Sequence, residues 1–180
     1  MQLVKRLAAA AALVLALAVP AIAQTAEQRD ALAARIAGFD AAMRTNDMSV
    51  IMGVVPPKVL EKLAAQFGVT TEQAIESAQQ QLDQAMQTVK LVSFGMDLAA
   101  TEFLTLSDGT LYALIPTETV MQLGETDKIR ATSTTLGLLD EGTWYLVRVE
   151  DPQQVALVKE IYPAFADVTF PTGAMEPVAE

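Results

Sequence analysis

The chain contains no cysteine and no histidine in its 180 residues. Because it has no cysteine, no disulfide can stabilise the fold in an oxidising compartment. Because it has no histidine, it lacks the commonest acid–base group of enzymes and the usual ligand of zinc. The same absence excludes the serine–histidine and cysteine–histidine nucleophile systems. Several large enzyme classes are therefore excluded before any motif is considered.

Basic residues are also scarce, since 12 Lys and Arg stand against 22 Asp and Glu and the formal net charge is −10. An acidic chain is repelled by the phosphates of nucleic acids and by anionic lipid surfaces. No strongly basic stripe in the sequence offsets this repulsion. We therefore predict no nucleic-acid partner, and we interpret the acidity as a source of solubility.

Several acidic residues stand in segments that are typical of turns, namely Asp108, Asp127, Asp140 and Glu141. Aspartate is common in turns because its side chain accepts hydrogen bonds from the local backbone. The sequence contains no D-x-D-x-D-G pattern of the kind that binds calcium. We therefore predict no dedicated metal site and no cofactor.

An uncharged hydrophobic run covers residues 7–19, after Lys5 and Arg6 and before Pro20. A small-x-small motif then ends at Ala23. This order is typical of a secretory signal peptide, and the alanine-rich composition is typical of a bacterial one. The run is too short to remain as a comfortable membrane span. We therefore predict cleavage after Ala23, a periplasmic location and no stable membrane insertion of the mature chain.

Helical signals dominate the first part of the mature chain. Capping boxes follow Thr25 and Thr70, because each threonine has a glutamine three residues later. Pro57 fits the first turn of a further helix, where the missing N–H costs nothing. Apolar residues recur at helical spacing after each of these starts. We predict three helices, over residues 26–45, from residue 57 to Gly68 and from Thr70 to residue 88, with a short helical turn at 48–52.

The pattern changes to an alternation of period two after residue 88. Asp108-Gly109 is a strong hairpin signal, and two further turns follow near residues 124–127 and 140–142. Four strands are predicted, over residues 89–106, 110–120, 128–139 and 143–150. Because strands and helices do not alternate along the chain, a parallel doubly wound sheet is excluded. The sequence predicts an α+β fold with three N-terminal helices packed across one face of a curved four-stranded antiparallel meander.

The C-terminal part begins with Asp151-Pro152, which is a helix N-cap followed by proline at the first helical position. A last helix is predicted here, interrupted at Pro163. Residues 166–180 contain two more prolines and a glycine and show no periodicity, so we predict a flexible tail. The mature chain is thus expected to form one α+β domain over residues 24–165.

Hydroxyl residues are grouped in Thr132-Ser133-Thr134-Thr135. They could line a polar groove, but β-branched residues are also common in strands because they fit a pleated surface. We interpret them as ordinary strand residues. No serine of the chain lies in a G-x-S-x-G motif, so nucleophilic catalysis has no support.

Isomerase-type chemistry would need a carboxylate base and a donor to a developing oxyanion. The candidates are Asp40, Asp97, Tyr112 and Tyr145. Asp97 follows apolar strand residues, so it could be partly buried with a raised pKa. The alternative is that Asp97 accepts backbone N–H groups or meets solvent at a bulge.

The order of elements resembles the nuclear-transport-factor-two-like superfamily of cone-shaped α+β rolls, which share the cystatin-type layout. The resemblance covers residues 25–150. It rests on the long first helix, on the helical turn within NDMSVIMGVVPP (residues 46–57) and on the closing hairpin DEGTWYLVRV (residues 140–149). It implies an apolar cavity between helices and sheet. In this superfamily the cavity serves small-molecule binding, isomerase or dehydratase chemistry, or nothing when the surface binds partners.

The resemblance implies that Val54, Val55 and Pro56 form the apolar rim of such a cavity. Scattered methionines are candidates for its walls because their side chains are flexible and polarisable, the alternative being that they fill a core. The methionines concerned are Met43, Met48, Met52, Met86, Met96 and Met121. The expected ligand-binding residues are Phe39, Met43, Val54, Val55, Pro56, Met86 and Met96.

The sequence as a whole favours a secreted, non-catalytic binding protein. Its expected partner is an apolar small molecule or lipid, or else a protein of the cell envelope. The alternative is a histidine-free cavity enzyme of the isomerase or dehydratase type that uses an aspartate with a tyrosine.

Overall fold

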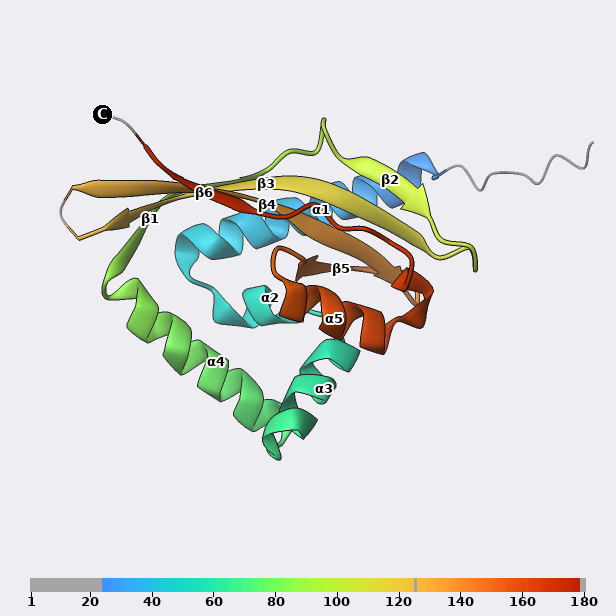
Figure 1. Ribbon diagram of the computed structural model, residues 1–180, viewed down its shortest axis with the longest axis horizontal. Coiled ribbons are helices and arrows are strands. Elements are labelled where there is room, and N and C mark those ends of the chain that lie inside the picture. Colours follow the sequence, from blue (N-terminus) through green and yellow to red (C-terminus); the bar gives the residue numbers. More distant parts are fainter. Residues whose placement is uncertain (1–23, 125, 179–180) are drawn as a thin grey trace, which may run out of the picture.

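A computed structural model of the protein describes residues 24–124 and 126–178 (Figure 1). The predicted signal peptide and its cleavage site after Ala23 lie outside these residues. The described chain is an α+β protein, as predicted. Four helices come first: α1 (Ala26–Thr45), α2 (Met48–Gly53), α3 (Pro57–Phe67) and α4 (Thr71–Met86). They are followed by β1 (Val89–Met96), β2 (Glu102–Thr105), β3 (Leu111–Leu123), β4 (Asp127–Asp140) and β5 (Thr143–Arg148), and then by α5 (Pro152–Ile161), the 3-10 helix η1 (Pro163–Phe165) and β6 (Ala174–Pro177).

The helix starts follow the local signals in the sequence. At α1, the Thr25 hydroxyl accepts the Gln28 N–H at 3.2 Å, and the Gln28 side chain accepts the Thr25 N–H at 2.9 Å. The same reciprocal capping box begins α4. Pro57 opens α3, and Gly68 ends it in the left-handed conformation with φ 66°. Such ends depend on neighbouring residues alone, which is why the sequence predicts them.

The strands form one curved antiparallel sheet whose main order is β1-β3-β4-β5. The two long central strands β3 and β4 pair along almost their whole length, from Tyr112 opposite Leu138 to Leu123 opposite Asp127. On its outer edge, each long strand pairs with two shorter strands, one after the other along its length. β1 and β2 pair with β3, and β5 and β6 pair with β4 (Figure 1). Four strands of the sheet therefore follow the predicted meander, and two short strands extend it.

The single strand predicted over residues 89–106 is wrong, because the structure divides it into β1 and β2. Asp97 follows β1, and its carboxylate accepts the N–H groups of Ala99 at 2.9 Å and Ala100 at 3.0 Å. This local turn competes with the strand ladder for the backbone donors. Both halves still pair with β3.

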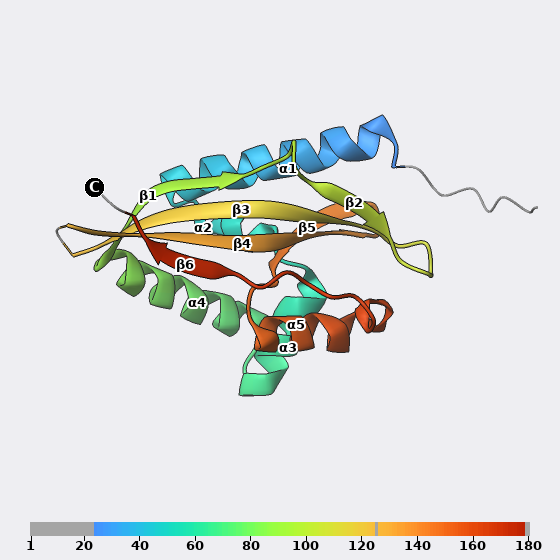
Figure 2. The same ribbon diagram turned by 45° about the horizontal axis from the view of Figure 1, so that its top comes forward.

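The helices cover both faces of the sheet, and not one face as predicted (Figure 2). On one face Leu32 and Ile36 of α1 pack against the sheet. On the other face Val158 of α5 and Phe165 of η1 pack against Leu136 of β4. Because β4 carries buried residues on both faces, it requires a covering layer on each side.

Gly137 of β4 allows α1 to approach the sheet closely. A Cβ atom at this position would lie 3.3 Å from both Ala113 Cβ and Ile115 Cδ1, and 3.5 Å from Leu32 Cδ1. These distances are at or below ordinary van der Waals contact, so the missing side chain leaves room for the Leu32 side chain. A side chain at this position would therefore crowd Ala113, Ile115 and Leu32.

The C-terminal segment differs from the flexible tail that we expected. Phe170 is buried with Phe165, and β6 pairs with β4 through Ala131 and Met175. The cause is the length of β4, which extends past the end of β5 and leaves backbone groups available at its edge. A strand of four residues is too short to show periodicity in the sequence, so nothing local predicts it.

Candidate functional site

A cavity of about 540 Å³ lies between the helices and the sheet. Its walls come from α1, α2, α3 and α4, from strands β1, β3, β4 and β5, and from α5. Apolar side chains form most of these walls. Examples from three different helices are Phe39 of α1, Leu63 of α3 and Leu82 of α4. The cavity therefore exists only where elements distant in the sequence meet.

The floor of the cavity is the half of the sheet where small hydroxyl residues replace large apolar ones. Along the face of β3 that meets α1, Ile115 is followed by Thr117 and Thr119. Along β4, Ser133 and Thr135 occupy the corresponding places. A sheet position with a short side chain cannot fill the space up to the next layer, so this half of the interface stays open.

Two hydroxyl groups of the floor, those of Thr117 and Thr135, are hydrogen-bonded to each other. Thr117 Oγ1 donates to the carbonyl oxygen of Ile115 at 3.1 Å, and it lies 2.8 Å from Thr135 Oγ1. Because the Thr117 hydroxyl donates its proton to the Ile115 carbonyl oxygen, the Thr135 hydroxyl is the donor in the second hydrogen bond. Buried hydroxyl groups carry little penalty when they are hydrogen-bonded. Thr117 and Thr135 can therefore face an apolar cavity without leaving their hydroxyl groups unsatisfied.

The remaining polar groups of the cavity lie at its β5 end. Arg148 is the last residue of β5, and it forms an ion pair with Glu150. Gln154 of α5 accepts the Glu150 backbone N–H through its side-chain oxygen at 3.2 Å. Both Arg148 and Gln154 line the cavity. The cavity thus has one polar end and otherwise apolar walls.

The corner between α2 and α3 closes one side of the cavity. Val54 follows α2, and its carbonyl oxygen accepts the Leu146 N–H at 2.7 Å, which attaches the corner to the edge strand β5. Val54 and Val55 line the cavity. Pro56 is fully buried beside them and is not among the lining residues.

The other expected ligand-binding residues are distributed as follows. Phe39, Met43 and Met96 line the cavity. Met86 is the last residue of α4, and its side chain lies outside what the structure describes. Among the further methionines considered, Met52 and Met121 also line the cavity. Apolar residues from α1, the α2–α3 corner and β1 are thus brought together at one site.

Sequence reasoning missed the hydroxyl floor. Ser133 and Thr135 belong to the run that we interpreted as ordinary strand residues, and both face the cavity. Thr117 and Thr119 repeat the same alternation on the paired strand β3. The available signal was that two paired strands both carry hydroxyl groups on the side that faces the helices. This signal can be recognised only when the strand register is known.

The structure does not bring the four candidate catalytic residues together, and none of them lines the cavity. Asp40 is paired with Arg44 on the surface of α1. Asp97 is exposed in the turn between β1 and β2, where it accepts backbone N–H groups. Tyr112 is buried on the α5 face of the sheet, and Tyr145 lies under the Arg35 guanidinium at 5.9 Å.

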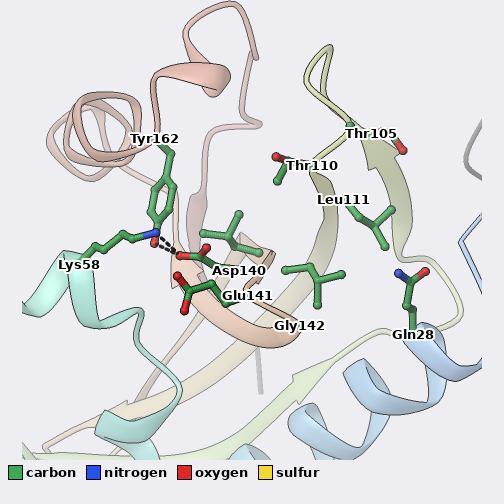
Figure 3. Close-up of a pocket in the computed structure, with 12 residues that line it drawn as sticks. Gln28, Lys58, Thr105, Thr110, Leu111, Asp140, Glu141, Gly142 and Tyr162 are labelled. Carbon is green, nitrogen blue, oxygen red and sulfur yellow. Dashed lines mark hydrogen bonds and ion pairs between the residues drawn. The ribbon is translucent and has the colours of Figure 1, made fainter.

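A carboxylate–tyrosine contact is found in a second pocket of about 360 Å³ (Figure 3). There the Tyr162 hydroxyl donates to Asp140 Oδ2 at 3.3 Å, and Lys58 Nζ binds the same oxygen at 2.8 Å. Figure 3 shows both side chains pointing at Asp140 from α3 and from the end of α5. Because Asp140 stands in the β4–β5 turn, the cluster connects three separate elements.

The ionisation of this cluster supports a structural role. Burial raises the pKa of Tyr162 well above its usual range, and the Asp140 carboxylate adds to the effect. The hydrogen bond to Asp140 raises the pKa of Lys58. Tyrosine therefore stays neutral and lysine stays charged at neutral pH, so neither is prepared to accept a proton.

A pH titration of the tyrosines provides a test of the cluster of Lys58, Asp140 and Tyr162. Burial also raises the pKa of Tyr112, so the native state keeps protons on two tyrosines that the unfolded chain loses above a pH of about 10. Stability should therefore decrease as the pH rises above about 10. We expect tyrosinate absorbance of the native protein to lag behind that of the unfolded chain, and Tyr162→Phe to reduce the lag. Identical titration curves for the folded and unfolded chains would contradict the burial of these hydroxyl groups.

Three further observations concern metal binding, membrane spans and similarity to known proteins. Within residues 24–124 and 126–178, no group of three or more acidic side chains is placed to hold a metal ion. Over the same residues, none of the helices has the length and hydropathy of a membrane span. No protein-family model, no curated protein and no solved structure matches the chain.

Proposed function

We propose that the protein is a non-catalytic binding protein that holds an apolar small molecule or a lipid in the 540 Å³ cavity. The observation that carries the proposal is the chemistry of the walls. Among the described lining residues there is no aspartate, glutamate, lysine or tyrosine. An apolar cavity within the usual range of about 300–1,000 Å³ suits ligand binding, whereas general acid–base catalysis would need a group in it that gains or loses a proton near neutral pH.

The walls also suit a ligand of variable shape. Met43, Met52, Met96 and Met121 all contribute to the cavity. Methionine side chains are flexible and polarisable, so they can adapt to different apolar surfaces. This favours binding over the alternative of an isomerase or dehydratase, whose aspartate and tyrosine have no counterpart in this cavity.

Two further features belong to the proposal: a periplasmic location and a fold of the nuclear-transport-factor-two-like kind. The signal-peptide pattern supports a periplasmic location for the mature chain. The arrangement of helices against a curved antiparallel sheet, with a cavity between them, supports a roll of the nuclear-transport-factor-two-like kind. The periplasmic location and this kind of fold are both parts of the proposal.

A protein partner in the envelope is the second candidate function. The observation in its favour is the turn between α3 and α4, where Phe67 and Val69 are exposed. The α3–α4 hairpin projects away from the sheet, so this apolar turn is accessible (Figure 1). Exposed apolar groups at a projecting tip are a common feature of protein-binding surfaces.

Native mass spectrometry of the full chain, isolated from the periplasm of cells that express it, distinguishes these candidates. We expect the protein to carry an additional mass that is lost on extraction with organic solvent. Recovery of the bare protein, together with no binding of apolar probes, would contradict the ligand proposal. A co-purifying protein that is lost on Phe67→Ser would support the second candidate instead.

Filling the cavity should abolish ligand binding. Thr119→Trp places an indole on the cavity floor, where it takes the space of the ligand. We expect at least a tenfold loss of affinity for an apolar fluorescent probe, because the ligand and the indole cannot both occupy the same volume. The measurement is a fluorescence titration with an anilinonaphthalene sulfonate dye.

The matched control is Thr132→Trp. Thr132 is exposed on the neighbouring strand β4, and the residue after it faces the cavity, so its own side chain points to the opposite face of the sheet. This variant should bind the probe like the unmodified protein. Equal binding by all three proteins would show that the probe does not enter the cavity.

A further inference from the structure

The polar groups of the cavity form a row across the strands. Thr117 of β3 stands opposite Ser133 of β4, and Thr135 of β4 stands opposite Arg148 of β5. The Thr117 and Thr135 hydroxyl groups lie 2.8 Å apart and connect the two pairs. The row therefore runs from the middle of the cavity floor to a guanidinium group at the β5 edge.

The other end of the cavity is apolar. Leu91 of β1 stands opposite Met121 of β3, and both line the cavity. Met43 from the last part of α1, Leu82 of α4 and Val89 of β1 complete this end. A molecule that fills the cavity thus meets hydrocarbon at one end and hydrogen-bond donors at the other.

Arg148 is suited to bind an anionic group at the opening. Its side chain is 60% exposed, although the residue also lines the cavity. A guanidinium has five N–H donors in a planar fork that matches a carboxylate or a phosphate. Glu150 engages one amino group of Arg148, which leaves the rest of the fork for a second anion. Exposed ion pairs of this kind are weak, so a ligand can compete with Glu150.

We infer that the ligand is a single-chain amphiphile with an anionic head group, either a carboxylate or a phosphate. The head group binds Arg148 at the β5 edge, and the hydrocarbon chain runs along the hydroxyl floor towards Met121 at the apolar end. This inference rests on the proposed function, because it names the ligand of the same cavity. It also gives the ligand one orientation.

The opposite orientation is disfavoured by the position of the other nearby arginine. Arg44 lies in the last turn of α1, close in sequence to Met43 of the apolar end, and it is paired with Asp40. Arg44 does not line the cavity. Its side chain is 70% exposed, so it resembles Arg148 in exposure and in having one acidic partner. Arg44 is therefore a matched control for the role of Arg148.

The test is a fluorescence titration of the full mature chain with dansyl-undecanoic acid and with its methyl ester. The unmodified protein should bind the acid more tightly than the ester. Arg148→Gln should weaken binding of the acid by about tenfold to a hundredfold, since hydrogen bonds between charged groups are lost, and should leave the ester unchanged. Arg148→Lys should restore part of the affinity, and Arg44→Gln should have no effect.

Displacement of the bound acid distinguishes the two head groups. Dodecanoate and dodecyl phosphate should both displace the probe better than dodecanol, and the more effective of them identifies the head group. Equal affinity of the unmodified protein for acid and ester, or an equal loss of both in Arg148→Gln, overturns the anionic head group but leaves the apolar cavity as a binding site. A larger effect of Arg44→Gln than of Arg148→Gln overturns the orientation. Failure of the unmodified protein to bind either probe overturns the proposed function itself.

Discussion

Trp144→Ala should lower the free energy of unfolding by about 3–5 kcal/mol. The indole is 3% exposed on the α1 face of β5, and its edge meets the Phe103 ring at a centroid distance of 6.4 Å. Its Nε1–H donates to the carbonyl oxygen of Gln28 at 2.9 Å, which connects β5 to the first turn of α1. Truncation therefore leaves a cavity in the core and removes a contact between β5 and α1.

The measurement is urea unfolding followed by far-ultraviolet circular dichroism, because Trp144 is the single tryptophan of the chain. Trp144→Phe is the matched control, since it keeps an aromatic ring and loses only part of the volume and the N–H donor. It should destabilise the protein clearly less than Trp144→Ala. A loss below about 1 kcal/mol for Trp144→Ala would mean that this side chain is not part of the core.

Phe165→Ala should be comparably destabilising, at about 3–5 kcal/mol. Phe165 is 1% exposed in η1, on the sheet face opposite to α1. Its ring meets the Tyr112 ring at 5.2 Å edge-to-face and the Phe170 ring at 5.9 Å. Removing the ring takes away the buried surface and the aromatic contacts through which η1 packs against the sheet.

Phe67→Ala is the matched control for this variant. Phe67 ends α3 with 76% of its surface exposed, so the same substitution should change stability by no more than about 0.5 kcal/mol. Urea unfolding of both variants gives the comparison. Equal effects of the two substitutions would show that the C-terminal layer does not cover the sheet.

The helices of the N-terminal part could be predicted because their limits are local. The Thr25 and Thr70 capping boxes, Pro57 and Gly68 each act on backbone groups within a few residues. The hairpin at Gly109 and the turn at Gly142 are local in the same sense, since both glycines adopt positive φ angles there. Strand positions and the α+β class follow from these turns.

Other features could not be predicted because they depend on partners far along the chain. Asp97 ends β1 by a turn that competes with pairing to β3. The C-terminal β6 exists because β4 extends beyond β5, and α5 covers the second face because Leu136 and Leu138 need a layer there. In each case the sequence contains suitable residues, but only the sheet supplies the partner.

In the candidate site, too, some features follow from the local sequence and others only from the tertiary structure. Composition alone excluded histidine and cysteine chemistry, and periodicity alone supplied apolar residues such as Phe39 and Met43 for a cavity wall. The tertiary structure decided that α1, the α2–α3 corner and β1 meet around one space, and that Thr117 and Thr135 form its floor. The physical reason is strand register: a shift of one residue between β3 and β4 would place the Thr117 and Thr135 hydroxyl groups on opposite faces of the sheet. Local sequence determines which side chains are present, whereas register and packing decide which of them face the cavity.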